Sequence, residues 1–486
     1  MVRKSIKGFL KKLGITGLFF GRSLKTVPEG SVVLFPYEPN VLNCGITGVL
    51  SFKTTHVRAE GLPIEVLEGT VEALSKVASK RLEQKGGRQE EDDSESRELL
   101  GETKRLCQKL KEQSVFCQIF SNRVYQERLV DLCEKLEAVV ASEDMDRAER
   151  MGRLDAEESE ALGQRLTELR DILWSLKHEV IENIEKITAL GRFDQYDSDP
   201  LCVGLFREVN LIFNNLDRLE VRGRDSAGLS LLLVLDEAQF SEFRQVLKEG
   251  ALLGEFEERQ GNPVLVNGGI ATSKQAMGIS VVFTYKVAAE VGNLGDNVQY
   301  LRNQVRDDLV LQHCVRCRHI HHSAVAHTRW ASVGEITEAN CHPVDSRPSD
   351  SHRTIHVCLN GDIDNYQRLR QEIERETGKS ISEEITTDTK IIPLQIEKYL
   401  NKETTLAQAF RLAVSDFDGS HAIAMHSDLA PGKVFLAQRG SGQAIFVGLA
   451  EGHYVPASEV YGLVEETSRY VKMDGEKVVE GLSGKT

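Results

Sequence analysis

The chain has no apolar run that approaches the length of a membrane-spanning helix, and no small-residue cleavage site follows its basic first 25 residues. These absences argue against a membrane protein and against a secreted one. An excess of positive charge is also lacking, since 60 lysine and arginine residues face 74 aspartate and glutamate residues, a net charge of −14. That balance argues against general binding to nucleic acid or to anionic membranes.

What is present fits a soluble protein of the reducing cytoplasm. The 486 residues suffice for two or three domains with a sizeable core, and a hydrophobic content of 41% is ordinary for such a protein. Since no secretory signal accompanies the nine cysteines, we expect them to be reduced thiols and the protein to be cytoplasmic.

Hydrophobic spacing predicts a layered α+β domain. Residues 44–52 are typical of a buried strand, residues 64–80 of an amphipathic helix, and LSLLLVLD at 229–236 of a central strand. In the second half of the chain, short β segments alternate with helices over 366–377 and 389–400. Helices combined with antiparallel-type strands favour layers of both.

A long helical stretch follows the first helix. Residues 83–102 are polar and acidic, and we expect them to be exposed or to lack structure. ASEDMDRAERMG, residues 141–152, predicts a connection. Around it, apolar residues recur at heptad-like spacing: Leu106, Leu110, Cys117, Phe120 and Val124, then Leu162, Leu166, Leu169, Leu173, Leu176 and Val180. The pattern predicts an antiparallel helical hairpin, a coiled coil that either caps the core or serves as an arm for a partner or for self-association.

Four short strings hold residues that together can cleave the amide of a free amino acid. They are NCGITG with Cys44, AHTRWAS with Arg329, LNGDIDNY with Asn360 and Gly361, and TTDTK with Asp388. A cysteine thiol can attack the amide carbon, and a side-chain amide beside a backbone N–H can hold the oxyanion. An arginine and a carboxylate can bind the two charged ends of the amino acid.

Three more strings extend the pattern: LEVRGRDSAG at 219–228, AQRGSGQAIFVGL at 437–449 and PASEV at 456–460. In this order the strings resemble the glutaminase domain of class II (N-terminal nucleophile) glutamine amidotransferases, in particular the glutaminase half of glutamine–fructose-6-phosphate amidotransferases. The resemblance implies a four-layer αββα domain that hydrolyses L-glutamine to glutamate and ammonia, without a cofactor, for the synthesis of amino-sugar phosphates.

The resemblance also implies how the chain is divided. Residues 1–43 would be a leader or propeptide, 44–80 the first part of the glutaminase domain, 81–204 an inserted α-helical hairpin, and 205–486 the second part, with a smaller insertion at about 236–275. In the family, the first helix leads almost directly to the RGxDSAG string, which here follows only after the inserted segment.

The resemblance assigns roles to the central residues. In the family the cysteine is the first residue of the mature chain, and its own α-amine activates the thiol, so Cys44 would act only after the leader is removed; otherwise it is a structural cysteine. Asn360 and Gly361 would form the oxyanion hole. Arg329 would bind the α-carboxylate of glutamine and Asp388 its ammonium; the alternatives are a surface salt bridge and a helix N-cap.

Further residues would shape the pocket. Trp330 follows the arginine as in the sugar-phosphate amidotransferases, and Ser332 stands where the family usually has threonine. His342, in NCHP, would line the pocket or pack beside it. Arg222 and Asp225, in RGRDSAG, would order loops around the pocket.

One cluster of histidines and cysteines has the spacing of a metal site. It is HCVRCRHIHH, with His313, Cys314, Cys317, His319, His321 and His322. The string leads into a predicted strand, whose alternation would point the histidines to opposite faces, so we expect no metal here.

The resemblance implies partners as well. Ammonia would pass to a sugar-phosphate isomerase or synthase domain, either in a longer chain or in a separate one. The helical insertion could join copies into a homo-oligomer. A second hypothesis is a non-catalytic module that senses glutamine or directs assembly while an uncut leader blocks Cys44.

Overall fold

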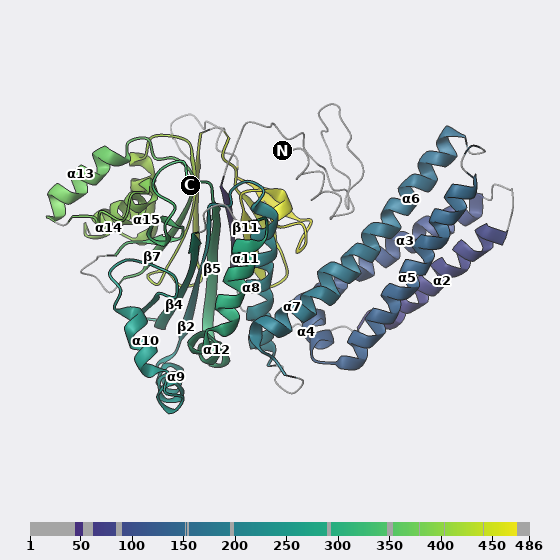
Figure 1. Cartoon of the computed structure of the whole chain (residues 1–486), viewed down its shortest axis with the longest axis horizontal. Coiled ribbons are helices and arrows are strands. Elements are labelled where there is room, and N and C mark those ends of the chain that lie inside the picture. The colour runs from purple at the N-terminus through teal and green to yellow at the C-terminus, as the bar shows by residue number, and fades with distance from the viewer. Residues whose placement is uncertain are drawn as a thin grey trace. The chain divides into compact units, whose positions relative to one another are not determined.

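The computed structural model is an α+β protein with two antiparallel sheets, as the hydrophobic spacing predicts (Figure 1). It describes residues 44–51, 62–83, 90–150, 152, 155–194, 199–288, 293–347, 353–378, 380–402, 404–440 and 442–473. The predicted leader, residues 1–43, lies outside these residues. All nine cysteines are free thiols.

The larger sheet has eight strands in the order β12-β10-β11-β1-β5-β2-β4-β3. Their bounds are β1 Gly45–Ser51, β2 Ser226–Leu235, β3 Ile270–Gln275, β4 Gly278–Ala288, β5 His319–Arg329, β10 Phe446–Leu449, β11 His453–Ala457 and β12 Tyr470–Lys472. All ten residues of β2 are buried, because both faces of this central strand are covered. The strands predicted at 44–52 and 229–236 are therefore confirmed as β1 and most of β2.

The smaller sheet lies against the larger one. Its order is β6-β7-β8-β9, with β6 Val344–Asp345, β7 Ile355–Gly361, β8 His421–Ser427 and β9 Val434–Arg439. Polar contacts cross between the sheets: the Ser230 hydroxyl lies 2.6 Å from His356 Nδ1 and 2.8 Å from His426 Nε2. Because these groups are buried, each needs such a partner in place of water.

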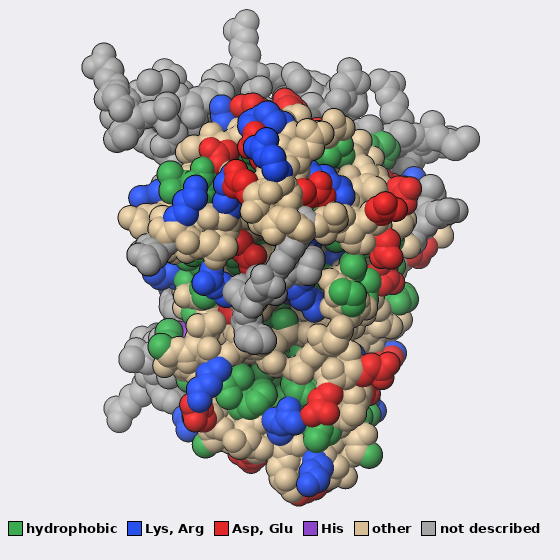
Figure 2. All heavy atoms as spheres, turned by 90° about the vertical axis from the view of Figure 1, so that its left-hand side faces the viewer, with side chains coloured by type: hydrophobic (Ala, Val, Ile, Leu, Met, Phe, Trp, Pro, Cys, Tyr) green, Lys and Arg blue, Asp and Glu red, His purple; other side chains and the backbone are tan. Residues whose placement is uncertain are grey.

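Helices cover the outer faces of both sheets (Figure 1). The larger sheet is contacted by α8 Pro200–Leu219, through β1 and β5, and by α11 Asp296–Asp307, through β2 and β4. Helix α12 Leu309–Arg316 packs against α8 and α9. At the other end of the sheet, α9 Glu237–Glu249 contacts β2 and β4, and α10 Leu253–Gln260 contacts β3. Helices α13 Tyr366–Thr377, α14 Ile391–Leu400 and α15 Leu406–Asp416 cover the smaller sheet. Figure 2 shows acidic and basic side chains interspersed on the face that these last helices present. The helix predicted at 366–377 is confirmed as α13.

The predicted helical insertion holds a bundle of long helices together with α2. The helices are α2 Ile64–Glu83, α3 Glu90–Leu110, α4 Gln113–Phe120, α5 Arg123–Arg150, α6 Ala156–Trp174, the π-helical turn η1 Ser175–Ile181 and α7 Glu182–Gly191. Two ion pairs, from Asp144 of α5 to Arg170 of α6 and from Glu137 of α5 to Lys177 of η1, show that α5 runs antiparallel to α6 and η1. No helix among the described residues is long and apolar enough to cross a membrane.

The sequence prediction that the acidic run 83–102 is exposed or lacks structure is correct only in part. Residues 90–102 are structured, because they belong to α3, and the side chains of Ser96 and Leu100 are buried. The cause is helical spacing: positions four residues apart share the face that packs against α2 and α6. The exposed residues of this stretch are Ser94, Glu95, Arg97, Glu98 and Gly101. Residues 84–89 lie outside the described residues.

The predicted connection at 141–152 is wrong over residues 141–150, because α5 continues to Arg150. Glu143 is buried there and pairs with Arg165 of α6 at 2.8 Å, so a polar residue faces the inside of the bundle. A turn lies at Gly152, the last residue of the predicted connection, whose φ is +93°. One apolar position also differs from the heptad prediction, since Val124 is 61% exposed.

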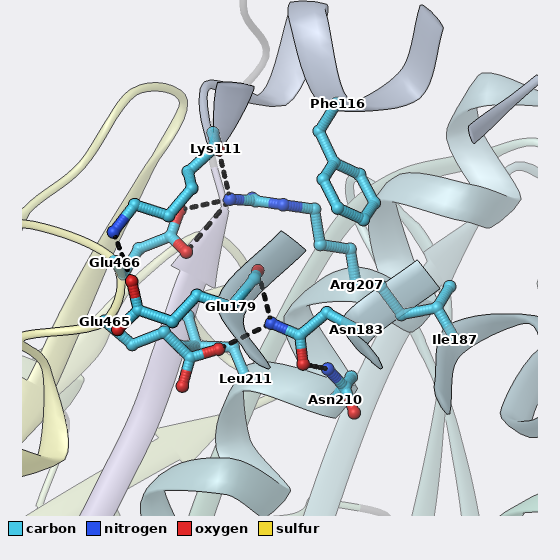
Figure 3. Close-up of a pocket in the computed structure, with 10 residues that line it drawn as sticks. All are labelled: Lys111, Phe116, Glu179, Asn183, Ile187, Arg207, Asn210, Leu211, Glu465 and Glu466. Carbon is cyan, nitrogen blue, oxygen red and sulfur yellow. Dashed lines mark hydrogen bonds and ion pairs between the residues drawn. The ribbon is translucent and has the colours of Figure 1, made fainter. Parts of the chain in front are cut away.

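A buried ionic cluster ties the insertion to the core (Figure 3). Arg207 of α8 donates to the carbonyl oxygen of Lys111 at 2.6 Å and pairs with Glu466 at 2.7 Å. Asn183 of α7 donates to Glu465 at 2.7 Å. The space left between these side chains is about 20 Å³, room for about one water molecule. The cluster therefore acts as a structural joint and not as a ligand site.

The charge of Glu466 is fixed by its neighbours. Burial alone would raise the pKa of this carboxyl, but the Arg207 guanidinium and His453 hold its pKa at about 2. A carboxyl whose pKa is lower in the folded chain stabilises the fold above the unfolded pKa near 4.5, and that stabilisation is lost as the pH falls toward 2.

We predict that Glu466→Gln lowers the free energy of unfolding at pH 7 by about 3 kcal/mol, because Arg207 is left buried without its partner charge. The difference from wild type should shrink as the pH falls from about 4.5 toward 2. Urea unfolding at pH 7 and pH 3 measures both effects. Glu72→Gln, which removes an exposed i,i+4 pair with Lys76, is the control and should leave the free energy of unfolding nearly unchanged, because water and salt screen an exposed pair. An equal loss at both pH values would contradict this account.

Candidate active site around Cys44

Strand pairing brings Cys44 next to Arg329 and Trp330. Strands β1 and β5 are antiparallel with Gly45 opposite Thr328, so Cys44, one residue before β1, lies opposite the last residue of β5. The Trp330 N–H then donates to Cys44 Sγ at 3.2 Å, and the Sγ lies 3.4 Å from the Trp330 carbonyl oxygen. The thiol thus lies where the central strands β1 and β5 meet, just before the first residue of β1 and opposite the last residue of β5.

The Cys44 thiol is a weak acid in this setting. It is 8% exposed, and burial raises its pKa to about 12, while the Trp330 N–H and the charge of Arg329 oppose the rise. The thiol is therefore protonated at neutral pH. Among the described residues, no side-chain base hydrogen-bonds to the sulfur; its partners are both backbone atoms of Trp330.

Asn360 and Gly361 end strand β7 beside the cysteine. Asn360 Nδ2 donates to the Cys44 carbonyl oxygen at 2.8 Å, and Asn360 Oδ1 lies 3.1 Å from His327 Nε2. Gly361 has a φ of +82°, and a Cβ there would lie 2.0 Å from the Ser420 carbonyl oxygen. Only glycine fits this position, because both the conformation and the close approach exclude a side chain.

Arg329 and Asp388 are both buried near the thiol. The Arg329 guanidinium donates to the carbonyl oxygens of Val333 and Glu335, the second at 3.1 Å, which leaves other N–H groups of its fork unused by these bonds. The Asp388 carboxylate accepts the Ile363 N–H at 2.7 Å. Burial raises the pKa of Asp388 to about 6, with a further rise from the charge of Asp362. Arg329 is therefore not a surface residue, and the pKa of Asp388, at about 6, lies well above the ordinary value for an aspartate.

The three other predicted pocket residues lie in different settings. Trp330 is 39% exposed. Ser332 is exposed, and its hydroxyl donates to Asp362 at 2.6 Å. His342 is buried, its Nε2 lies 2.8 Å from the Thr389 hydroxyl, and its ring centroid lies 4.4 Å from that of His327. Burial lowers the pKa of His342 well below its ordinary value, so the ring is neutral.

The RGRDSAG loop contacts the backbone that holds the thiol. Asp225 accepts the Ala331 N–H at 2.8 Å, and its own N–H donates to the Arg329 carbonyl oxygen at 3.0 Å. A Cβ at Gly223 would lie 2.5 Å from the Trp330 nitrogen, so this loop needs a glycine. Arg222 pairs with Glu459 at 2.7 Å, and no hydrogen bond among the described residues links it to Cys44.

The histidine and cysteine cluster departs from strict alternation. A bulge shifts the register of β2 and β5 between Val234 and Leu235. As a result His319 Nε2 lies 2.9 Å from His322 Nδ1, and His322 Nε2 lies 2.6 Å from Glu208. Two of these histidines therefore share a side that alternation would have separated. Within the described ranges, no group of three or more such side chains is arranged to hold a metal ion.

Two residues of this site were absent from the sequence prediction. His327 lies inside the AHTRWAS string, two residues before Arg329, so the string itself was the available signal. Asp362 directly follows the Asn360–Gly361 pair. The spacing of residues in the sequence does not indicate a role for His327 or Asp362, because their partners, Asn360 and Ser332, lie about 30 residues away in the chain.

Comparison with known proteins points to one family. Residues 338–465 match the model of a glutamine amidotransferase domain. Over 156 residues the chain is 38% identical to the glutamine–fructose-6-phosphate aminotransferase (isomerizing) of Methanothermobacter thermautotrophicus, covering 32% of this chain and 25% of that protein. Over 280 residues it is 26% identical to the Chlorobaculum tepidum protein of the same name, covering 57% of this chain and 34% of that protein.

The chain thus spans between a quarter and about a third of these two relatives. A solved structure of "the allosteric regulatory enzyme of purine biosynthesis" aligns with 54% of this chain and 42% of that one at 16% identity and a TM-score of 0.35, too low to support a conclusion. The matched domain contains His342, Asn360, Gly361 and Asp388. Residues 338–465 are thus similar to a glutamine amidotransferase domain, and part of the chain is similar to the glutamine–fructose-6-phosphate aminotransferases.

Proposed function

We propose that this domain hydrolyses L-glutamine to glutamate and ammonia with Cys44 as the nucleophile. The observation that carries the proposal is the position of the Cys44 thiol, which lies between the Trp330 backbone and the end of β7, where the Asn360 amide contacts the same residue. Buried Arg329 and Asp388 are close enough to influence the pKa of the thiol. These are the groups that amide cleavage of a free amino acid requires.

The reaction has two stages. The Cys44 thiolate attacks the side-chain amide carbon of glutamine, and the tetrahedral intermediate collapses with release of ammonia, which leaves a thioester. Water then hydrolyses the thioester to glutamate and the free thiol. The Gly361 N–H and the Asn360 amide, which has a second N–H beyond the one given to Cys44, would stabilise the oxyanion. Losing one such donor typically raises the barrier by about 3 kcal/mol.

Charge complementarity would select a free amino acid. The unused N–H groups of the Arg329 fork suit the α-carboxylate, and the Asp388 carboxylate suits the ammonium. Trp330, Ser332 and His342 would line or support the pocket. The contacts of the Trp330 backbone with the Cys44 thiol, of Ser332 with Asp362 and of His342 with Thr389 support that view.

The base would be the α-amine of Cys44, freed by cleavage after Asn43. While the two residues are joined, the Cys44 nitrogen is an amide whose lone pair is delocalised, so it cannot accept the thiol proton. A free α-amine has a pKa near 8 and can accept it at neutral pH. The absence of a side-chain base on the sulfur among the described residues, together with a thiol pKa of about 12, supports this role for the amine.

The finer architecture follows the same proposal. Helices outside two stacked sheets support a four-layer αββα domain formed by residues 44–80 and 205–486, with Arg222 and Asp225 ordering its loops. Residues 81–204 would be the inserted helical segment, and 236–275 the smaller insertion. The antiparallel α5–α6 pair supports a hairpin within the larger one.

Ammonia would pass to a sugar-phosphate isomerase or synthase domain, in this or another chain, for amino-sugar phosphate synthesis in the cytoplasm. The names of the relatives support this acceptor. The helical insertion could join copies of the chain. The alternative is a glutamine-sensing or assembly module, which the inert Cys44 thiol of an uncut chain favours.

We predict that Cys44→Ala, in a chain that otherwise begins at residue 44, abolishes ammonia release from glutamine and leaves the fold intact, because the mutation removes the nucleophile. Cys317→Ala, which removes a half-buried thiol whose contact is the carbonyl of its own helix, is the matched control and should keep full activity. Ammonia release by the Cys44→Ala variant at the wild-type rate would refute the proposal and favour the sensing alternative.

We predict that glutamine affinity falls as the pH drops below about 6, because Asp388 then becomes protonated and no longer attracts the ammonium. Asp388→Asn should bind glutamine weakly at every pH and lose this dependence. The pH profile of kcat/KM between pH 5 and 8 measures the effect, with the exposed Asp364→Asn as a control that keeps it. An Asp388→Asn enzyme with the wild-type profile would remove Asp388 from the substrate site.

A further inference from the structure

We propose that His327 is a positioning residue that keeps the Asn360 amide turned with its N–H groups toward Cys44. The inference rests on the proposed function, because its consequence is a correctly oriented oxyanion hole. His327 lies on β5 of the larger sheet, Asn360 lies on β7 of the smaller sheet, and both side chains are buried. The contact between His327 Nε2 and Asn360 Oδ1, at 3.1 Å, therefore joins the two sheets beside the thiol.

The hydrogen-bond partners determine which atoms carry protons. A backbone carbonyl oxygen only accepts, so the Asn360 atom that faces the Cys44 carbonyl at 2.8 Å must be the Nδ2 donor. The other amide atom is then Oδ1, which only accepts. His327 Nε2 must therefore carry a proton and donate it to Asn360.

The His327 ring is neutral, so it carries only one proton, and the contact with Asn360 requires that proton on Nε2. Burial, with the nearby charge of Arg329, lowers the pKa of His327 to about 3. A neutral imidazole has one N–H. The Leu359 backbone also interacts with the ring, but Nδ1 makes no well-formed hydrogen bond among the described residues, whereas Nε2 lies 3.1 Å from Asn360 Oδ1. The geometry therefore favours Asn360 as the acceptor of the ring proton.

Packing fixes the ring in turn. The His327 and His342 ring centroids lie 4.4 Å apart, and His342 is held by the Thr389 hydroxyl at 2.8 Å and by the Leu359 N–H at 3.5 Å. Rotation of the Asn360 amide by half a turn would place Oδ1 against the Cys44 carbonyl oxygen and Nδ2 against the His327 N–H. Both contacts would be repulsive, and an oxygen would face the developing oxyanion. His327 therefore selects the orientation in which Asn360 is a donor.

The test uses chains that begin at Cys44. His327→Leu removes the donor, whereas His327→Gln keeps a side-chain N–H that can reach the same oxygen. Because the oxyanion exists only in the transition state, we expect His327→Leu to lower kcat by about 100-fold and to change KM by less than about twofold. His327→Gln should recover at least about tenfold of the lost kcat.

His426→Leu is the matched control for the loss of a buried imidazole. His426 is 1% exposed and contacts serine hydroxyls between the same two sheets, but none of its described contacts reaches Asn360. It should lose stability, measured by thermal unfolding, and keep kcat within about twofold of wild type.

The outcomes separate the two proposals. A wild-type chain that releases no ammonia overturns the proposed function and this inference with it. An active wild type overturns this inference alone if His327→Leu keeps its kcat, if His426→Leu loses as much, if KM rises together with the fall in kcat, or if glutamine at 327 rescues nothing. A His327 tautomer protonated on Nδ1 at pH 7, seen by ¹⁵N NMR, would also overturn it.

Discussion

The antiparallel pairing of β1 with β5 is the constraint on which the candidate site depends. It sets Cys44 opposite Arg329, so the Trp330 N–H that follows points at the thiol. A slip of one residue would turn Ile46, which is buried between the sheets, to the other face of the sheet. The same pairing that completes the core therefore fixes the thiol relative to Arg329.

Buried polar groups surround this pairing, and each is tied to a partner on another element. His327 joins β5 to the end of β7 through Asn360, and Arg207 joins the helical insertion to the core through Glu466. Such pairs add little net stability, but leaving one partner alone is costly. They therefore restrict how sheets and helices can pack, and this keeps the groups around the Cys44 thiol in one arrangement.

The spacing of apolar residues predicted an element correctly where that element packs through a single apolar face. The helices predicted at 64–80 and 366–377 are α2 and α13, and the α+β class follows from them and the strands. It failed where burial depends on a partner: α5 runs through residues 141–150 because Glu143 meets Arg165 of another helix. The motif strings indicated most residues of the candidate site, and their catalytic roles stay predictions. His327 could not be assigned, because its contact lies in the other sheet.

The central claim is that no side chain in the described part of the protein serves Cys44 as a base, and that its own α-amine does so once Cys44 is the N-terminal residue. The direct test is the pH dependence of the rate at which a small alkylating agent modifies Cys44, followed by mass spectrometry, in the full chain and in a chain that begins at Cys44. The account predicts that the full chain reacts appreciably only well above pH 10, in line with a pKa of about 12, and that the shorter chain titrates near pH 8. Equal reactivity of both chains at pH 7 would contradict it.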